Sequence, residues 1–233
     1  MISLILAAAL VFQVYQFHYY LAQKIGSFYV KIDLKELLPN VSRETIEKLA
    51  EFREMILAED QNLISKNDKN FIWTRHFYYS LRLVQFITSN GNDIIDIGSG
   101  AGLPGIPVSI LYGAKNKVFL CENRPKRVSF LKKCIVNLDL KNTEVIPTKA
   151  EKIENKKFDI ILARAVSQLN HLLSISYNIC KKNTTLLLHK GVHIDEEIVQ
   201  ATKYWDFTHV LHENEREKGS FILELKNIIK SIT

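Results

Sequence analysis

The sequence predicts an α/β protein built on a doubly wound, mostly parallel sheet with a helical segment before it. Short apolar runs typical of buried strands alternate with helical patterns between residues 93 and 203, and a glycine-rich turn follows the first run. This alternation places helices on both faces of a parallel sheet. Two strand patterns close the chain without a helix between them, which predicts an antiparallel strand at one edge.

The helical segment contains two patterns. Ser42 can cap a first helix that runs to about Leu57, and the apolar residues of FIWTRHFYYSLRLVQFI are spaced for a second helix. The predicted strands cover about 94–97, 117–121, 143–147, 158–163 and 184–191, with closing strands at about 205–211 and 221–226. Helices are predicted at about 105–111, 125–138, 167–180 and 195–203.

The motif D-x-G-x-G-x-G follows the first strand at Asp96, Gly98, Gly100 and Gly102. Glycine permits positive φ and close approach of the backbone to a ligand, and ligands of such sheets lie at the carboxyl ends of the strands. The third glycine of the dinucleotide fingerprint is replaced by Leu103, and no P-loop pattern occurs. The motif looks like the first motif of the S-adenosylmethionine (SAM) methyltransferases, although glycine-rich turns also occur without ligands.

Charged residues follow the second predicted strand. Glu122 ends this strand, and an acidic residue there can accept hydrogen bonds from ribose hydroxyls. The next helix carries basic residues at Arg124, Lys126, Arg127, Lys132 and Lys133. Runs of charge usually form only a solvated face, but at the ligand end of a sheet they could meet phosphates.

Composition limits the class of protein. At 233 residues, 47% apolar and 24% charged, the chain is long enough for one globular domain with an appendage. Its net charge of +6 is a weak signal for a polyanion such as RNA. Cys121, Cys134 and Cys180 form no C-x-x-C pair and no His/Cys cluster, so we expect small apolar residues, a reducing cytoplasm and no metal site.

The first 23 residues carry no charge, and Lys24 is the first charged residue. The stretch is long enough to cross a bilayer if helical, but it lacks the basic start of a signal peptide. It can be a membrane anchor, a helix packed on the domain, or an upstream stretch outside the functional protein; membrane contact of residues 1–23 is not the favoured interpretation. The expected division is a 1–33 extension of unknown role, N-terminal helices at 34–90, and a SAM-binding methyltransferase domain at 91–233.

Seven sequence pieces in one order carry a resemblance to a known family. The most specific is DIGSGAGLPGIPVSI, which begins at Asp96. The supporting pieces are NLI at 62–64, RHFYYSL at 75–81, PKRVSFL at 125–131, KAE at 149–151, ARAVSQL at 163–169 and HKG at 189–191. Over about residues 34–226 the chain thus resembles the bacterial 16S ribosomal RNA guanine-N7 methyltransferases, the RsmG or GidB family.

The resemblance implies transfer of a methyl group from SAM to N7 of a specific guanine in 16S ribosomal RNA of the small subunit. It implies SAM contacts from Gly98, Gly100, Leu103, Glu122, Ala150, Glu151 and Arg164, with Glu122 at the ribose and Ala150 and Glu151 beside the adenine. It implies RNA contacts from Arg75, His76, Arg124, Lys126, Arg127 and Lys190, and a positioning role in catalysis for Arg164 and Lys190. The expected partner is the small ribosomal subunit, with no DNA, no metal and a cytoplasmic location.

Two features depart from the family. Tyr79-Ser80 stands where members usually carry Asp-Ser, so any polar role of that aspartate is absent. The closing region HENEREKGSF offers no clear match for the arginine usually found before the last strand, and Arg216 is the candidate substitute. Both departures concern details of the site and not the class of enzyme.

The chemistry of the target atom agrees with the resemblance. Guanine N7 has a free lone pair, so no residue has to remove a proton, and alignment of the reactants dominates. Methylation at cytosine C5 needs a cysteine nucleophile in a Pro-Cys context, and amine methylation favours a [DNS]-P-P-[YF] loop; neither occurs, and the fourth strand ends in ARAV. Three alternatives stay open: a SAM enzyme for another RNA or a small molecule, a non-catalytic nucleotide-binding module, and a membrane-associated protein organised by residues 1–23.

Overall fold

The computed structural model describes residues 41–65, 69, 71–87, 89–164, 167–214 and 217–231, without the side chains of Thr74 and Arg75. The expectations for residues 1–33 and for Arg216 lie outside these residues, and so does any side-chain role of Arg75. The chain divides into two units, Met1–Ile46 and Glu47–Thr233, and the second contains the sheet. No described helix is both long and apolar enough to cross a bilayer. The expected boundaries at residues 33 and 90 stay predictions.

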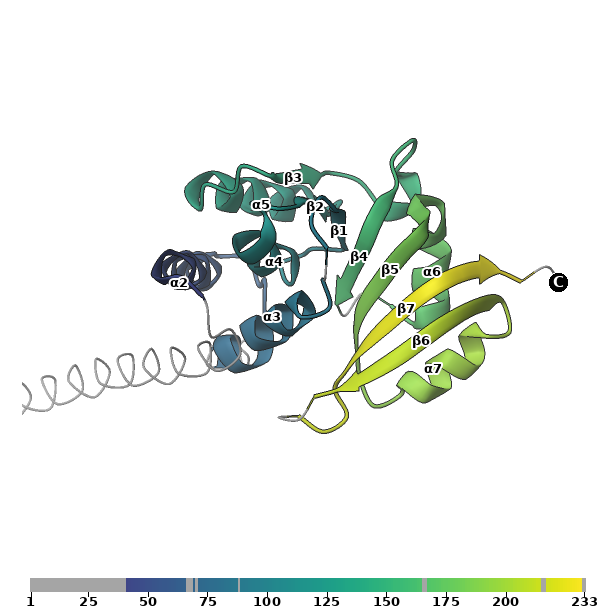
Figure 1. Ribbon diagram of the computed structural model, residues 1–233. Coiled ribbons are helices and arrows are strands. Elements are labelled where there is room, and N and C mark those ends of the chain that lie inside the picture. The colour runs from purple at the N-terminus through teal and green to yellow at the C-terminus, as the bar shows by residue number, and fades with distance from the viewer. Residues whose placement is uncertain are drawn as a thin grey trace, which may run out of the picture. The chain divides into compact units, whose positions relative to one another are not determined.

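A seven-stranded sheet forms the centre of the second unit, in the order β3-β2-β1-β4-β5-β7-β6 (Figure 1). The strands are β1 Asp93–Ile97, β2 Lys117–Cys121, β3 Thr143–Ile146, β4 Phe158–Arg164, β5 Cys180–Lys190, β6 Trp205–Glu213 and β7 Phe221–Lys230. The first five strands are parallel, whereas β7 runs antiparallel to both β5 and β6. The predicted fold class, including the antiparallel closing pair, is confirmed.

Helices cover both faces of the sheet because successive strand residues point to opposite sides. On one face Ile95 and Ile161 pack with α6 and α7; on the other Ile94 and Leu162 pack with α3 and α4 (Figure 1). The helices are α2 Arg43–Ala58, α3 Tyr78–Val84, α4 Gly105–Tyr112, α5 Pro125–Asn137, α6 Leu169–Ser176 and α7 Ile194–Ala201. Short turns of other helix types are η2 Ile72–Phe77, η3 Ala150–Lys152 and η4 Tyr177–Ile179.

Two elements differ from the sequence-based expectation. The second N-terminal helix begins as the π-helix η2 and becomes α-helical only at Tyr78. Strand β5 begins at Cys180, four residues before the predicted start, because Cys180 pairs with Phe158 of β4 before an irregularity, after which regular pairing resumes at Thr185. There the Thr184 hydroxyl donates to the Phe158 carbonyl at 2.6 Å, and Lys181 pairs with Asp159 at 2.7 Å. A strand start held by polar contacts has no apolar alternation for sequence analysis to detect.

The strand order reverses at β1, which has β2 on one side and β4 on the other. In such sheets the connections leave β1 and β4 toward opposite faces, and a crevice opens at their carboxyl ends. The glycine-rich turn after β1 lies at this point. The residues that follow β2, β4 and β5 lie along the same edge of the sheet.

Candidate active site

The glycine-rich turn after β1 has a backbone that favours glycine. Gly98, Gly100 and Gly102 have φ values of +69°, +54° and +84°, a region that side chains with a Cβ rarely adopt. The turn is anchored to the end of β2, since the N–H groups of Gly98 and Ser99 donate to the Cys121 carbonyl at 2.9 and 3.0 Å. The sequence therefore sets both the shape of the turn and its place beside β2.

Asp96 is a buried carboxylate under this turn, with 1% of its surface exposed. Its Oδ2 accepts the Gly105 N–H at 3.0 Å, and Oδ1 has no hydrogen-bond partner among the described residues. Burial raises the pKa of Asp96 to about 7. A Cβ on Gly105 would lie 2.8 Å from Asp96 Oδ2, so only glycine allows this approach. Neither residue was among the predicted site residues, although an aspartate inside an apolar strand was a usable signal.

Glu122 connects the end of β2 to the glycine-rich turn. Its side chain is 4% exposed, and Oε1 accepts the N–H groups of Asn123 and Arg124, both at 2.9 Å. Oε2 accepts the Gly100 N–H at 3.1 Å and lies 3.7 Å from Nη1 of Arg127. Because a carboxylate oxygen accepts about two hydrogen bonds, Oε2 keeps one acceptor position for a ligand hydroxyl.

The other predicted cofactor residues beside the turn differ in burial. Leu103 and Ala150 are 8% and 4% exposed, and Ala150 packs in the same core cluster as Ile97. Glu151 is exposed, and its carboxylate lies 3.9 Å from Nζ of Lys149. Ala150 is thus suited to support an adenine ring through the position of the backbone, whereas a role for Glu151 stays a prediction.

The residues around the turn fit SAM. Asp96 Oδ1 is a buried acceptor without a partner, a condition that is costly unless a donor is supplied. Glu122 offers a further acceptor position beside Gly100, and the positive-φ glycines leave no Cβ between the backbone and a ligand. A ligand rich in hydroxyl and ammonium donors matches this set of acceptors.

Arg164 lies half-buried at the carboxyl end of β4, on the face covered by α3. Its guanidinium contacts Nδ1 of His76, and its Nη1 donates to the His76 carbonyl at 3.5 Å. His76, from η2, is only 8% exposed. The structure thus joins two predicted residues that are 88 positions apart. The RNA contact predicted for His76 stays a prediction, and its burial means that any such role acts through Arg164.

His189 occupies the corresponding position at the end of β5. Its Nε2 is buried without a hydrogen-bond partner in the described residues, and its ring makes a T-shaped contact with the Tyr79 ring, with 6.1 Å between the centroids. Burial, followed by the charges of Arg164 and Arg82, lowers the pKa of His189 to about 3, so the ring is neutral. The Tyr79 hydroxyl donates to the Glu217 carboxylate. The tyrosine that replaces the usual aspartate therefore contacts both the site and the loop before β7.

Lys190 points to the opposite face, toward α7. Its side chain is 7% exposed, and Nζ donates to Glu197 Oε2 at 2.6 Å and to the Ser167 carbonyl at 2.9 Å. An ammonium group has three N–H bonds, so one remains for a ligand. Glu197 and Ser167 were not predicted, although Glu197 stands in an acidic first turn of the helix that follows HKG.

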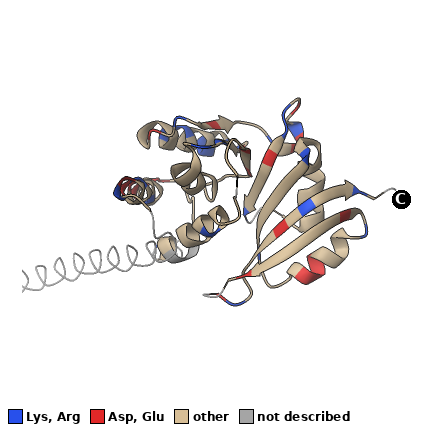
Figure 2. Ribbon diagram, viewed as in Figure 1, with Lys and Arg blue, Asp and Glu red and all other residues tan. Residues whose placement is uncertain are grey.

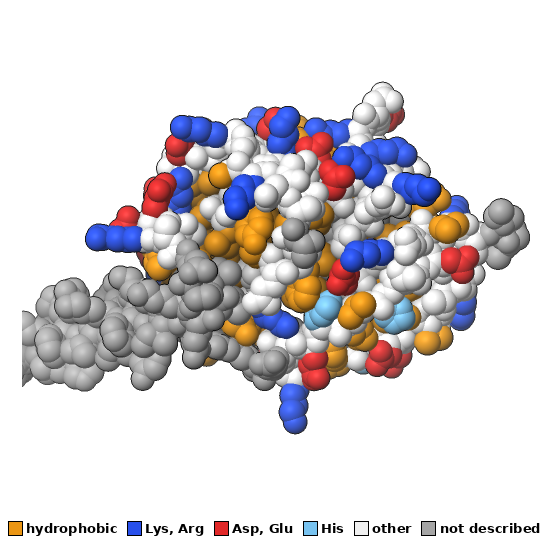
Figure 3. All heavy atoms as spheres, in the orientation of Figure 1, with side chains coloured by type: hydrophobic (Ala, Val, Ile, Leu, Met, Phe, Trp, Pro, Cys, Tyr) orange, Lys and Arg blue, Asp and Glu red, His pale blue; other side chains and the backbone are white. Residues whose placement is uncertain are grey.

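The basic residues of α5 lie on the surface beside the turn. Arg124 and Lys126 are exposed, and the Arg127 side chain is 29% exposed. Figure 2 marks Lys and Arg positions on the ribbon of α5, and Figure 3 shows Lys and Arg side chains along the upper side of the molecule in the same view. Within the described ranges, no group of three His, Cys, Asp or Glu side chains is arranged to hold a metal ion.

Known proteins share both sequence and fold with this chain. The sequence profile of the GidB family, described as rRNA small subunit methyltransferase G, matches residues 45–221. Ribosomal RNA small subunit methyltransferase G of Rickettsia rickettsii is 37% identical over 82% of this chain and 99% of its own length. The protein of the same name from Bartonella bacilliformis is 34% identical over 84% and 93%. The solved structure of M. jannaschii TYW2 in complex with AdoMet superposes with a TM-score of 0.50 at 15% identity, over 69% and 78% of the chains.

The order and directions of the strands are those of the class I SAM-dependent methyltransferase fold, which the AdoMet complex shares. Because the profile covers most of the chain and the relatives align over nearly their whole length, the chain belongs to the rRNA small subunit methyltransferase G family. The resemblance inferred from the seven sequence pieces is confirmed.

Proposed function

We propose that this protein transfers the methyl group of SAM to N7 of one guanine in 16S ribosomal RNA, in the cytoplasm. The observation that carries the proposal is the family match, which extends over residues 45–221 and so includes the glycine-rich turn and the ends of β2, β4 and β5. Both relatives named above carry small-subunit ribosomal RNA in their names. The proposed partner is the small ribosomal subunit.

Chemistry at N7 suits the side chains at this edge of the sheet. SAM supplies a methyl group on a sulfonium, and the N7 lone pair forms the new bond to carbon as the bond to sulfur breaks. No proton leaves N7, so no strong base is needed, which agrees with His189, whose pKa burial lowers to about 3 and whose ring is therefore a weak base. The protein therefore contributes mainly alignment of the two reactants.

The three cysteines argue against methylation of a pyrimidine carbon through a thiolate. Burial raises the pKa of both Cys121 and Cys134 to about 12 and that of Cys180 to about 11. A thiol with such a pKa stays protonated near neutral pH, and only the thiolate is a strong nucleophile. Cys121 in addition donates its S–H to the Thr148 carbonyl at 3.2 Å. Cys121 and Cys134 are buried in the core, and Cys180 packs half-buried against it.

We assign the site residues as follows. Gly98, Gly100, Leu103, Glu122, Ala150, Glu151 and Arg164 bind SAM. Arg75, Arg124, Lys126, Arg127 and Lys190 contact RNA, and the buried His76 acts on the RNA through Arg164. Arg164 and Lys190 position the reactants. The exposed residues Arg124 and Lys126 flank the start of α5 next to Glu122. Phosphate contacts of this kind release counterions, so RNA binding should weaken steeply with added salt.

The test uses tritiated SAM and small subunits from a strain that lacks this protein. N7-methylguanine is alkali-labile, so borohydride and aniline should cut the labelled RNA at one guanine. Label on cytosine, on an exocyclic amine or on ribose would contradict the proposed target atom. SAM binding without any labelled RNA would favour a non-catalytic module, and label in a small molecule of the extract would favour a different substrate class.

We further propose that residues 1 to about 30 are dispensable for the reaction, because every assigned site residue follows Asn62. A variant that begins near Lys31 should bind SAM and methylate small subunits within about twofold of the full chain. The control is the full chain purified in the same way. Normal SAM binding with no methyl transfer would place the extension in the catalytic unit.

A further inference from the structure

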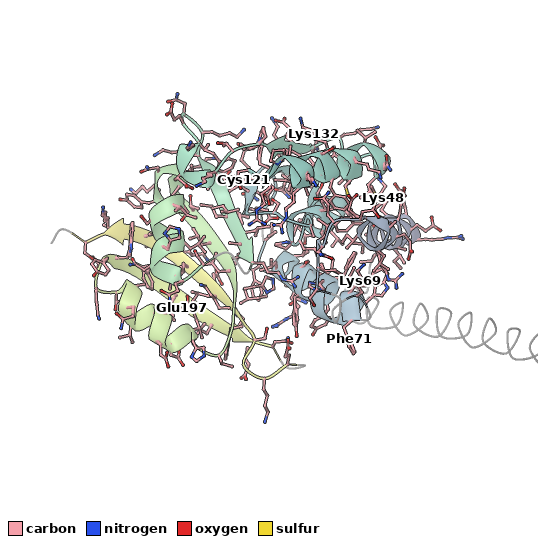
Figure 4. The ribbon with its side chains drawn as sticks, turned by 180° about the vertical axis from the view of Figure 1, so that it is seen from behind. Lys48, Lys69, Phe71, Cys121, Lys132 and Glu197 are labelled. Atoms are coloured by element: carbon pink, nitrogen blue, oxygen red, sulfur yellow. The ribbon has the colours of Figure 1, made fainter. Side chains whose placement is uncertain are left out.

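A pocket of about 310 Å³ opens at the carboxyl ends of β4 and β5, on the face covered by α6 and α7. Ala163 and Leu172 supply its apolar walls, and Ser167, Lys190, Gly191 and Glu197 lie around its polar end. The volume is at the lower end of the ~300–1,000 Å³ range of small-molecule sites. Neither SAM binding nor the assigned RNA contacts uses Glu197, which Figure 4 labels on α7.

The pocket lies one strand away from the glycine-rich turn. Ala163 on β4 is the register partner of Ile97, the residue that precedes Gly98. Because neighbouring strands are about 4.8 Å apart, the pocket on β4 and β5 lies within roughly 10 Å of the turn. A group held here is close enough to present a neighbouring atom to a methyl donor bound at the turn.

The polar end of the pocket holds one acidic and one basic side chain, and each can make a further hydrogen bond. Glu197 Oε2 accepts hydrogen bonds from Lys190 Nζ at 2.6 Å and from the Leu169 N–H at 2.7 Å. Oε1 of the same carboxylate makes no hydrogen bond to the described residues, and the side chain keeps 22% of its surface exposed. Lys190 has a third N–H beyond its bonds to Glu197 and Ser167. The pocket thus offers an acceptor and a donor side by side.

This pair suits a neutral ligand better than a phosphate, because an anion would face the Glu197 carboxylate. The Watson–Crick edge of guanine carries the O6 acceptor next to the N1–H and N2–H donors. Adenine presents a donor and an acceptor in the reverse order. Enzymes that modify an extruded base read this edge by hydrogen bonds.

We propose that the pocket between the ends of β4 and β5 holds the target guanine by its Watson–Crick edge, with Glu197 accepting from N1–H and N2–H and Lys190 donating to O6. The inference rests on the proposed function and identifies the residues that select its base. N7 lies on the neighbouring Hoogsteen edge, beyond O6, so a guanine held in this way keeps the N7 lone pair out of the hydrogen bonds to Glu197 and Lys190. Glu197 is then a specificity residue and not a proton acceptor.

The test compares guanine with inosine, which keeps O6, N1–H and N7 but lacks the N2 amino group. Small subunits are reconstituted with 16S RNA that carries either base at the position mapped by aniline cleavage. Loss of one hydrogen bond to a carboxylate should lower kcat/KM of the wild type about ten- to a hundredfold on inosine. Glu197→Gln should reduce kcat/KM on guanine and shrink this ratio to about threefold or less, because the amide no longer accepts from both donors.

The design separates recognition from folding. In Glu197→Gln the amide oxygen can still accept the Leu169 N–H, and SAM affinity should stay within twofold. Glu196→Gln, on the same helix with a side chain 80% exposed, is the matched control and should keep the wild-type ratio. A purely structural role for Glu197 would lower both rates equally and leave the ratio unchanged, which overturns the inference. Equal rates of the wild type on both bases overturn it too, without any variant, whereas no methylation of guanine by the wild type would overturn the proposed function instead.

Discussion

The two halves of the sheet's carboxyl edge are assembled in different ways. In the half formed by β1 and β2, the contacts join residues close in the chain: Gly105 and Asp96 are nine positions apart, and Gly100 and Glu122 are 22 apart. In the half formed by β4 and β5, Arg164 meets His76 across 88 positions. Tyr79, whose ring packs on His189, meets Glu217 across 138 positions.

The difference teaches how each half should respond to mutation. The half formed by β1 and β2 presents mainly backbone groups, and its glycines have positive φ values that other residues rarely adopt. A side chain added at one of these glycines should therefore abolish SAM binding. The half formed by β4 and β5 is a network of side chains that contact one another. Replacing one of these side chains should therefore lower activity without abolishing it. The following predictions test this contrast, from the largest expected effect to the smallest.

The largest effect is expected for Gly98→Val. At φ +69° a β-branched residue is strained, and its side chain would fill ligand space. We expect no SAM binding by calorimetry, with a folded protein by circular dichroism. Gly91→Val is the matched control, because Gly91 has φ +80° at the opposite end of β1 and an added Cβ meets nothing within 4 Å. Unchanged SAM affinity in folded Gly98→Val would contradict the cofactor assignment.

Arg164→Gln should impair methylation of the RNA much more than it impairs SAM binding. The change removes the charge that contacts His76 and lies near Asp96. We expect kcat/KM on small subunits to fall about a hundredfold, or ~2.7 kcal/mol, as for other truncated buried charge contacts. SAM affinity should change less than fivefold. Equal losses in RNA turnover and in SAM affinity would show that Arg164 acts through its SAM contact alone and does not position the RNA.

Glu122→Ala should weaken SAM binding by about 1.5 to 3 kcal/mol, the range for hydrogen bonds to charged groups. The lost group is the carboxylate whose Oε2 has room for a ligand hydroxyl beside the Gly100 N–H. Titration calorimetry measures the effect. Glu144→Ala, an exposed acid on β3, should bind SAM as the wild type does. An affinity loss equal in both variants would remove the ribose role from Glu122.

The smallest effect concerns the pH dependence of stability. The pKa of Asp96 is about 7 in the folded protein against 3.8 as the reference value, so between these values the folded state holds a proton that the unfolded state has lost. Stability must therefore fall as pH rises through this window. From pH 5 to pH 6.5 the free energy of unfolding should drop about 1 to 2 kcal/mol more in the wild type than in Asp96→Asn.

Urea denaturation at both pH values measures this difference without SAM. His189 has the opposite sign, since its pKa is lowered to about 3 and its contribution is lost as pH falls from its usual value near 6.5. His189 is present in both the wild type and Asp96→Asn, so its contribution cancels when the two pH profiles are compared. Identical pH profiles for the wild type and Asp96→Asn would show that Asp96 is ionised throughout this range.

The sequence by itself determined the alternating fold, the glycine-rich turn and the acidic end of β2. These features depend on local rules: apolar periodicity places strands and helices, and repeated glycine permits positive φ at Gly98, Gly100 and Gly102. Local rules also located Pro125 at the first turn of α5 and Ser42 as a cap, whose Oγ accepts the Thr45 N–H at 3.1 Å. The resemblance to the family in addition located the functional residues after β4 and β5.

Only the tertiary structure decided what those later residues touch. The face that a strand residue points to depends on register with distant strands, and a one-residue change reverses it. Register places Arg164 with His76 under α3, and it turns Lys190 away, toward Glu197 on α7. Burial likewise separates Asp96, with a pKa near 7, from the exposed carboxylate of Glu151. Such facts depend on packing between segments far apart in the chain, which no local pattern of residues encodes.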